Sequence, residues 1–170
     1  MPITPDTKNW TWVLEKPCPE CRFDATTFTA QDVAALLRAN AEAWPAVLAR
    51  PDVRVRPDDS TWSPLEYSAH VRDVFRIYDY RLGLMLAEHD PLFPNWDQDE
   101  TAVAEKYNEQ DPAVVSDDLL AAASSLADRF DTVTDWSRPG GRSDGVAFTI
   151  ETFAMYFIHD PIHHLWDVTK

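Results

Sequence analysis

Two histidines near the end of the sequence, His159 and His163, have the spacing that most clearly suggests chemistry. On an ideal α-helix, residues i and i+4 lie about 40° apart, one turn above the other. Two imidazoles held in this way can bind one metal ion. A buried, hydrogen-bonded pair without metal is the alternative interpretation. The adjacent His164 lies about 100° from His163 on the helical wheel and is expected to face another neighbour.

A third histidine, His70, is expected to complete this set. It lies at the edge of the apolar stripe of an earlier helix, which places it between core and groove. Glu66 lies one turn before it and Asp73 nearly one turn after it, so one of these carboxylates is expected to orient the imidazole. Three neutral histidines leave a divalent ion with open coordination positions, which is the pattern of catalytic sites. Such an ion lowers the pKa of bound water or binds a thiolate.

Cys18 and Cys21 form a C-x2-C motif flanked by prolines, in the sequence PCPEC. Four interpretations compete: half of a zinc knuckle, a redox pair, a disulfide, and two inert thiols. Structural zinc needs about four ligands, and the sequence has only two cysteines. A redox motif is expected at a helix start after a strand, which is not evident here. Reduced or adventitiously oxidised thiols are therefore the favoured interpretation.

Apolar periodicity and capping residues predict the elements that position these side chains. Four long helices are expected, from Thr29 to before Pro51, from Ser63 to about Glu88, from Asp111 to about Val133, and from Thr149 onward. A short helix is expected over 100–107 and a loop over 135–147. On the second long helix, Arg72, Arg76 and Asp79 are expected to face solvent. No alternating strand pattern of useful length occurs, so the fold class predicted is an all-α four-helix bundle.

The chain is expected to form one domain with an N-terminal arm. Its 170 residues fit one domain better than two, and 45% are hydrophobic. Residues 1–28 are predicted to be an extended arm packed on a bundle domain over 29–170. Trp10 and Trp12 are expected to be largely buried there, because aromatic surface is costly to leave in water. Trp96, in a long connection, either lines a cleft or plugs the bundle end.

Charge and composition exclude several function classes. Lys and Arg total 15 and Asp and Glu total 29, which gives a net charge of −14. Such an acidic chain binds polyanions poorly, so nucleic acid is not expected as a partner. No run reaches about 18 apolar residues and no secretory signal is visible, so neither a membrane partner nor export is expected. We therefore expect a cytoplasmic protein.

Two stretches of the sequence resemble the DinB-like superfamily. WSPLEYSAHVRDVFRIYDYRL, which carries His70, resembles the second helix of these proteins, and HDPIHHLWDV resembles their HxxxH helix. The group is related to the mycothiol-dependent maleylpyruvate isomerases, and KNWTWVLEKPCPEC resembles the N-terminal extension of an actinobacterial-type subgroup. The resemblance implies an up-up-down-down four-helix bundle. It also implies a divalent metal, zinc or nickel, held by His70, His159 and His163.

The resemblance further implies a function. It suggests a metal-dependent thiol transferase or hydrolase that acts on a small molecule, with a low-molecular-weight thiol as cosubstrate. The alternative is a non-catalytic, stress-associated bundle protein whose metal chiefly stabilises the fold. The partners considered are a small-molecule substrate and a second copy of the chain in a homodimer. Pro161 lies between the two helical ligands and lacks the N–H that would bond to the Phe157 carbonyl, so their geometry is expected to depart from ideal.

Overall fold

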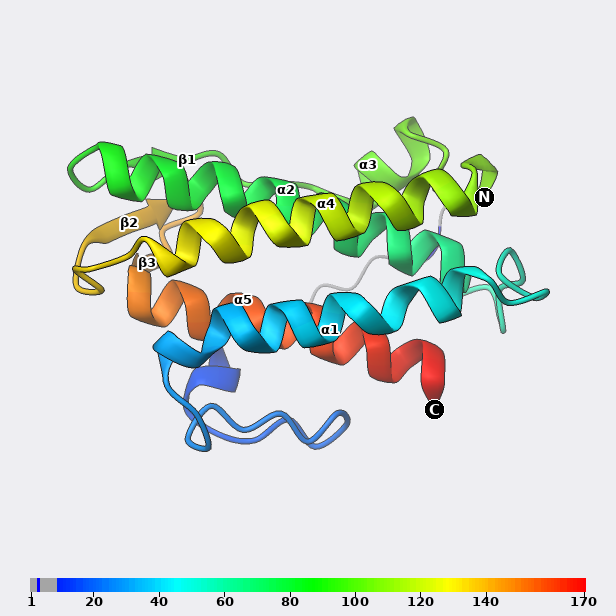
Figure 1. The fold of residues 1–170 in the computed structure, drawn as a ribbon, viewed down its shortest axis with the longest axis horizontal. Coiled ribbons are helices and arrows are strands. Elements are labelled where there is room, and N and C mark those ends of the chain that lie inside the picture. The colour runs from blue at the N-terminus through cyan, green and yellow to red at the C-terminus, as the bar shows by residue number, and fades with distance from the viewer. Residues whose placement is uncertain (1–2, 4–8) are drawn as a thin grey trace.

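Four long helices form a bundle in a computed structural model of the chain (Figure 1). The structure describes residue 3 and residues 9–170, so part of the arm expected over 1–28 lies outside the described residues. The bundle helices are α1 (Val33–Leu48), α2 (Pro64–Ala87), α4 (Pro112–Asp131) and α5 (Ile150–Thr169). The predicted all-α four-helix bundle is confirmed.

Helices α1 and α5 run in one direction, and α2 and α4 run in the opposite direction (Figure 1). Arg38, near the start of α1, pairs with Asp131 at the end of α4. Arg50, just after α1, donates to the carbonyl of Val168 near the end of α5. The order along the chain is therefore up-down-down-up, which corrects the expected up-up-down-down order. The connection over 88–111 returns along the bundle and lets α4 run parallel to α2 (Figure 1).

Capping residues fix where the helices begin. The starts of α2, α4 and α5 agree with those predicted, whereas residues 30–32 after Thr29 form a 3-10 turn and α1 begins at Val33. The hydroxyl of Ser63 accepts a hydrogen bond from the backbone N–H of Glu66 (3.2 Å). The Glu66 carboxylate accepts in return from the Ser63 N–H (2.9 Å). Pro64 occupies the first turn of α2, where no N–H is needed. Thr149 and Thr152 form the equivalent capping box at the start of α5.

Aromatic side chains fill the core between the four helices. The largest that are fully buried include Trp44, Phe75, Phe130, Phe153 and Phe157. One polar link crosses this core: the Trp44 indole N–H donates to Asn40 Oδ1, and Asn40 Nδ2 donates to the carbonyl of Pro161, each at 3.0 Å. The link joins α1 to the middle of α5. Within the described residues, no helix is both long enough and apolar enough to cross a membrane.

The connection between α2 and α4 covers one face of α2. It contains β1 (Leu92–Phe93), α3 (Gln98–Ala104) and a 3-10 turn, η3 (Tyr107–Glu109). Arg72, which was expected to face solvent, is buried beneath this connection and donates to the Gln110 side chain (2.8 Å). The expectation was wrong for Arg72, because the pattern of one helix does not show that a later segment covers it. Arg76, on the same helix, has a half-exposed side chain.

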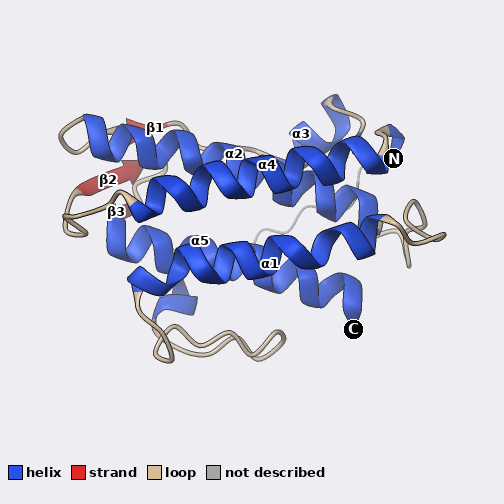
Figure 2. Cartoon of the chain, viewed as in Figure 1, coloured by secondary structure: helices blue, strands red, loops and turns tan. Residues whose placement is uncertain are grey.

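A small sheet closes one end of the bundle (Figure 2). The expected loop over 135–147 instead contains β2 (Pro139–Arg142) and the start of β3 (Ala147–Thr149). These two strands pair antiparallel, and β1 pairs parallel to β2. Strands of two to four residues are too short for a readable alternation, which is why the pattern did not predict them. A Cβ at Gly140 would lie 2.8 Å from Met85 Cγ, so glycine lets the sheet approach α2.

The described part of the arm packs on the bundle. It contains a 3-10 turn, η1 (Thr11–Leu14), and a second 3-10 turn, η2 (Ala30–Asp32), follows the arm just before α1. Val13 is fully buried, and Cys18 and Phe23 also join the core. Trp10 and Trp12 pack against the core but are only partly buried, which is less than expected. The arm lies beside α5, where Trp10 contacts the rings of His159 and His163.

Candidate metal centre

The bundle brings four histidines close together, but in two groups. The first, the cysteine–histidine group, consists of Cys18, Cys21, His159 and His163. The second, the aspartate–histidine group, consists of His70, Asp160 and His164. Within each group, the ligand atoms all lie within 4.8 Å of one another. The predicted set is thus divided: His159 and His163 meet, whereas His70 lies in the other group. That any of the three binds a metal stays a prediction.

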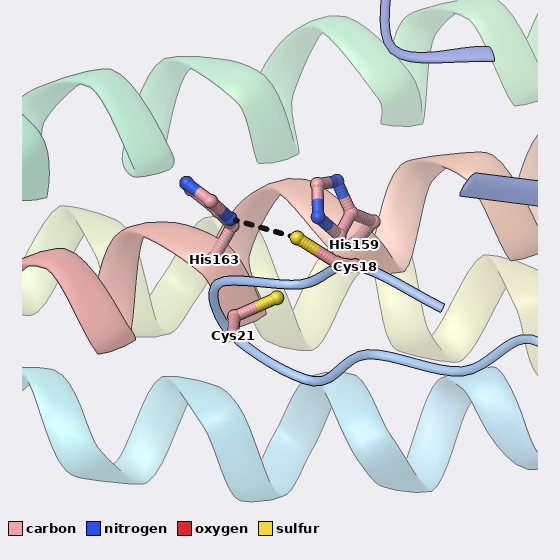
Figure 3. Close-up of side chains that lie close together, drawn as sticks. All are labelled: Cys18, Cys21, His159 and His163. Carbon is pink, nitrogen blue, oxygen red and sulfur yellow. Dashed lines mark hydrogen bonds between the residues drawn. The ribbon is translucent and has the colours of Figure 1, made fainter. Parts of the chain in front are cut away.

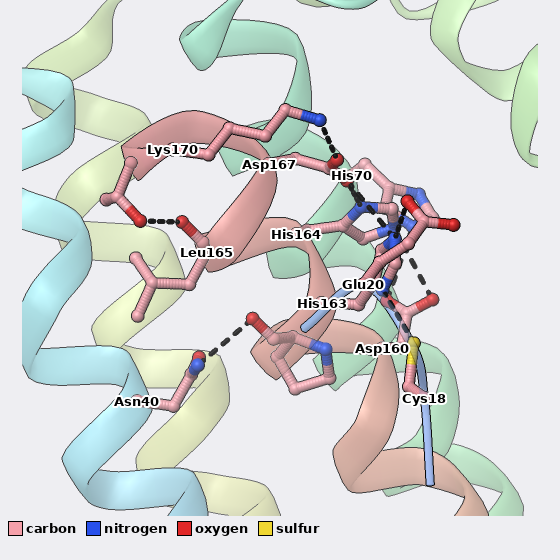
Figure 4. Close-up of polar contacts among 12 residues, drawn as sticks. Cys18, Glu20, Asn40, His70, Asp160, His163, His164, Leu165, Asp167 and Lys170 are labelled. Atoms are coloured by element: carbon pink, nitrogen blue, oxygen red, sulfur yellow. Dashed lines mark hydrogen bonds and ion pairs between the residues drawn. The ribbon is translucent and has the colours of Figure 1, made fainter. Parts of the chain in front are cut away.

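In the aspartate–histidine group, the carboxylate of Asp160 lies between two imidazoles (Figure 4). His70 Nε2 is 3.4 Å from Asp160 Oδ2, and His164 Nε2 is 3.6 Å from Asp160 Oδ1. Oxygen and nitrogen ligands about 2.0–2.1 Å from a tetrahedral ion lie about 3.4 Å apart. The separations are therefore those of ligands that share one ion.

Buried polar atoms of this group have no hydrogen-bond partner within the described part of the chain. They are both ring nitrogens of His70 and Oδ2 of Asp160. The His70 side chain is completely buried. Leaving a buried polar atom unpaired costs about 1–3 kcal/mol, and native structures rarely tolerate it without a compensating ligand or water. The residues thus fit a divalent ion bound among them.

Aromatic rings hold His70 in place. The Trp96 ring stacks on it with the planes 5° apart and the centroids separated by 5.5 Å. The ring of Trp62 also packs against the His70 ring, with the centroids 5.2 Å apart. The Trp96 indole N–H donates to Thr101 Oγ1 (2.7 Å), which fixes the ring at the start of the crossover helix α3. Trp96 also lines a cavity, so of its two interpretations the cleft wall is the one observed.

His164 is held between two carboxylates. Its Nδ1 lies 3.1 Å from Asp167 Oδ2, and its Nε2 faces Asp160. Burial disfavours a charged imidazole, but Asp160 and Asp167 raise the pKa of His164 to about 9. Burial also disfavours the Asp160 carboxylate, yet His164 and His70 hold its pKa well below its usual value. Without a metal, the His164 imidazolium is therefore balanced by the carboxylates of Asp160 and Asp167, and a bound cation would take the place of its proton.

The carboxylates expected to orient His70 do not contact it. Glu66 forms an ion pair with Arg56 and caps α2. Asp73 accepts a hydrogen bond from the Tyr107 hydroxyl. Both predictions were wrong. The spacing along α2 shows that the two carboxylates are near His70 in the sequence, but it does not show which residues of other segments pair with them. The carboxylate that faces His70 comes from α5.

The helical-wheel expectation for His164 is confirmed, although the neighbour was not predicted. It does face another neighbour than His163, but that neighbour is His70, with ring centroids 4.9 Å apart. Two i,i+4 pairs of α5 face the two groups, one turned to the arm and one turned to α2. The second pair is Asp160 and His164, and its spacing is visible in the sequence. A search that counted carboxylates as well as histidines would have found it.

The cysteine–histidine group joins the arm to α5 (Figure 3). Cys18 Sγ lies 3.7 Å from His163 Nδ1, and the rings of His159 and His163 are 5.1 Å apart. Both cysteines are free thiols. Burial raises the pKa of Cys21 to about 12, and the neighbouring Cys18 adds to this effect. Burial, together with His163, lowers the pKa of His159 to about 4.

A cavity of about 820 Å³ opens beside both groups. Asp160, His164, His159 and His163 line it, together with Trp62, Trp96 and Tyr156. Its wall is strongly acidic, with the carboxylates of Glu20, Asp97, Asp99, Asp144, Asp160 and Asp167. Among the described lining residues, Arg142 is the only Lys or Arg, and it pairs with Asp144. The aspartate–histidine group therefore lies at an acidic, accessible wall.

Fold and site together define an all-α bundle with a histidine–carboxylate group beside a cavity. No protein-family model matches the chain, and no curated protein matches it. Among solved structures, YfiT from Bacillus subtilis is similar, with a TM-score of 0.63 and 18% sequence identity over 99% of this chain and 92% of YfiT. That protein is described as a probable metal-dependent hydrolase with an unusual four-helix bundle topology. The likeness shows that the two chains share a fold.

Proposed function

We propose that this protein is a metal-dependent hydrolase that acts on a small molecule at the aspartate–histidine group. The observation that carries the proposal is a set of three candidate ligands, His70, Asp160 and His164, of which Asp160 and His164 line the cavity and His70 lies buried behind them. Within the described residues no fourth His, Cys, Asp or Glu joins the set. Catalytic metal sites keep three protein ligands and leave a position for water or substrate, whereas structural sites are closed. The likeness to YfiT, a probable metal-dependent hydrolase, is consistent with this proposal.

The three residues replace the ligand set expected from the sequence. His70 is kept, and Asp160 and His164 take the places of His159 and His163. Two imidazoles and one carboxylate form a ligand set that zinc uses in hydrolytic enzymes. A divalent ion held there would act as a Lewis acid and lower the pKa of a bound water molecule. Zinc is accordingly our proposal over nickel.

The protein's own side chains prepare this site. Asp167 binds Nδ1 of His164 and so leaves Nε2 directed at Asp160. This arrangement of carboxylate, histidine and metal fixes the ring orientation and increases ligand basicity. Trp62 and Trp96 enclose His70 and exclude water from that side of the group. The open side is the one that faces the cavity.

The charge of the cavity wall restricts the substrate class. Six carboxylates and one guanidinium line the cavity, so the wall remains anionic even after a divalent ion is bound. A field of this sign disfavours polyanions and favours neutral or cationic molecules. We therefore propose a small neutral or cationic ester or amide as the substrate, with no nucleic acid involved.

A thiol-dependent transfer uses the same open position, because a divalent ion also binds thiolates. The DinB-like resemblance of the sequence favours this reaction. Low-molecular-weight thiols are therefore added as a second arm of the assay. Turnover that requires the thiol would assign a transferase, and turnover without it would assign the hydrolase.

The test compares metal-loaded wild type with Asp160→Asn and His164→Ala on a panel of small chromogenic esters and amides. His89→Ala is the matched control, because His89 is an exposed histidine outside both groups. Loss of a group that merely orients a metal ligand costs about 10–100-fold, so we expect at least this loss in both ligand variants. The control is expected to keep full activity. Metal-dependent turnover that survives in both ligand variants would refute the proposed site.

A further inference from the structure

We propose that the cysteine–histidine group is a second metal site, a closed structural zinc centre that fastens the N-terminal arm to α5. Its ligands are Cys18, Cys21, His159 and His163. This site is separate from the aspartate–histidine group and would exist whether or not that group is catalytic. The favoured sequence interpretation of the two cysteines, as thiols without a role, did not consider ligands from the far end of the chain.

The separation of the ligand atoms fits a tetrahedral ion. Zinc–nitrogen distances of about 2.0–2.1 Å and zinc–sulfur distances of about 2.3 Å place tetrahedral nitrogen and sulfur ligands about 3.6 Å apart. Cys18 Sγ and His163 Nδ1 are 3.7 Å apart. All four ligand atoms lie within 4.8 Å of one another. Side-chain adjustments of under about 1 Å would bring the widest pairs to the tetrahedral separation.

One ligand of the group has an unpaired atom. Nε2 of His159 is buried and has no hydrogen-bond partner within the described part of the chain. His159 and His163 are 5% and 7% exposed, and Cys18 is 1% exposed, so three of the four residues lie almost entirely out of water, and Cys21 is partly buried. A buried imidazole without a partner is costly. This second observation points to a bound ligand independently of the ligand separations.

The ligand types select zinc. Two thiolates neutralise a divalent ion, and two imidazoles complete its coordination without adding charge, so the loaded site is neutral and suited to burial. Sulfur and imidazole ligands in tetrahedral geometry are typical of zinc. The spacing within each half, C-x2-C and H-x3-H, is also that of structural zinc sites. The two halves are unusual only in being 138 positions apart, from Cys21 to His159.

Two carboxylates lie near the outer ring nitrogen of His163. His163 binds Cys18 with its Nδ1 side, and its Nε2 lies 3.8 Å from Asp167 Oδ2 and 3.9 Å from Glu20 Oε2. Such a carboxylate on the outer nitrogen fixes the ring of a metal-binding histidine. Asp167 also holds His164 of the other group. One carboxylate therefore supports a histidine of each site.

A closed zinc here would hold the arm on the bundle. The loop that carries both cysteines would be tied to the middle of α5, beside the histidines that line the cavity. Since the four ligands meet only in the folded chain, the free energy of binding adds to stability. The cysteine–histidine group would then be structural and the aspartate–histidine group open.

Cobalt substitution tests the proposal, because the aspartate–histidine group contains no sulfur. The full chain, reduced and freed of metal, is titrated with Co2+ alone while its near-ultraviolet absorption is recorded. We expect sulfur-to-cobalt charge-transfer absorption that saturates at one ion per chain. Cys18→Ser and Cys21→Ser are expected to lose most of it, and His70→Ala is expected to keep it. Retention in His70→Ala separates this site from the one in the proposed function.

Zinc analysis and X-ray absorption provide the second measurement. Zinc-loaded wild type is expected to show two sulfur neighbours at about 2.3 Å in this site, and the cysteine double variant is expected to bind one zinc fewer. Cys21 is less buried than Cys18, so Cys21→Ser is the variant expected to keep the helical content by circular dichroism. Absence of charge-transfer absorption in reduced wild type would overturn the proposal. So would a Cys18–Cys21 disulfide in protein purified under reducing conditions with zinc present.

Discussion

The buried link from α1 to α5 makes a quantitative prediction for Asn40→Ala. Asn40 accepts from the Trp44 indole N–H and donates to the carbonyl of Pro161, both at 3.0 Å. Trp44 is fully buried, so the truncation leaves its N–H without a partner. An orphaned buried donor costs about 1–3 kcal/mol, and the lost bond to Pro161 adds about 1 kcal/mol. We expect the free energy of unfolding to fall by about 2–4 kcal/mol.

Urea denaturation of the metal-free protein, monitored by circular dichroism, measures the change in the free energy of unfolding. In thermal unfolding of a chain of this size, the melting temperature should fall by about 2–4 °C per kcal/mol, or about 5–15 °C in total. The double variant Asn40→Ala with Trp44→Phe is the control, because it removes the orphaned donor together with its partner. We expect the double variant to lose less stability than the sum of the two single variants. Additive effects, or a loss below about 0.5 kcal/mol in Asn40→Ala, would refute the reasoning.

Three further predictions concern the bundle and the arm. Burial opposes the charge of Glu66, but the hydrogen bond from Arg56 holds the pKa of its carboxyl below the usual 4.5. Glu66→Gln should therefore destabilise the protein at neutral pH. In acid titrations the difference in stability from wild type should disappear as the pH falls below 4.5 through the lowered pKa. Gly140→Ala should lower stability by about 1–3 kcal/mol in urea melts, because the added methyl meets Met85; an unchanged midpoint would show that Met85 moves freely. Deleting residues 1–16 should lower the melting temperature by several degrees, and an unchanged curve would mean that this part of the arm contributes no stability.

The starts of the long helices could be predicted from the sequence because they depend on local chemistry. A capping box involves residues only three positions apart, as at Ser63 and Glu66 or at Thr149 and Thr152. The apolar stripes that turn each helix toward the core are equally local. The four helices and the bundle class followed from these signals.

The grouping of the ligands was decided only by the tertiary structure. Neighbouring positions on α5 differ by about 100° in direction, so a small rotation of the helix decides which pair faces α2 and which faces the arm. The structure turns Asp160 and His164 toward His70, and it turns His159 and His163 toward the cysteines. No spacing within α5 contains that information. The order of helix directions depends likewise on the path of a long connection.

The sequence by itself therefore determined the four long helices and the bundle class. The tertiary structure decided which side chains meet. Cys21 and His159 are 138 positions apart, and the contact between them depends on how the arm packs on α5. Arg72 is buried because a later segment covers it. Local patterns reflect the energetics of a few neighbouring residues. These contacts instead depend on the packing energy of the whole chain, which no single segment of the sequence determines.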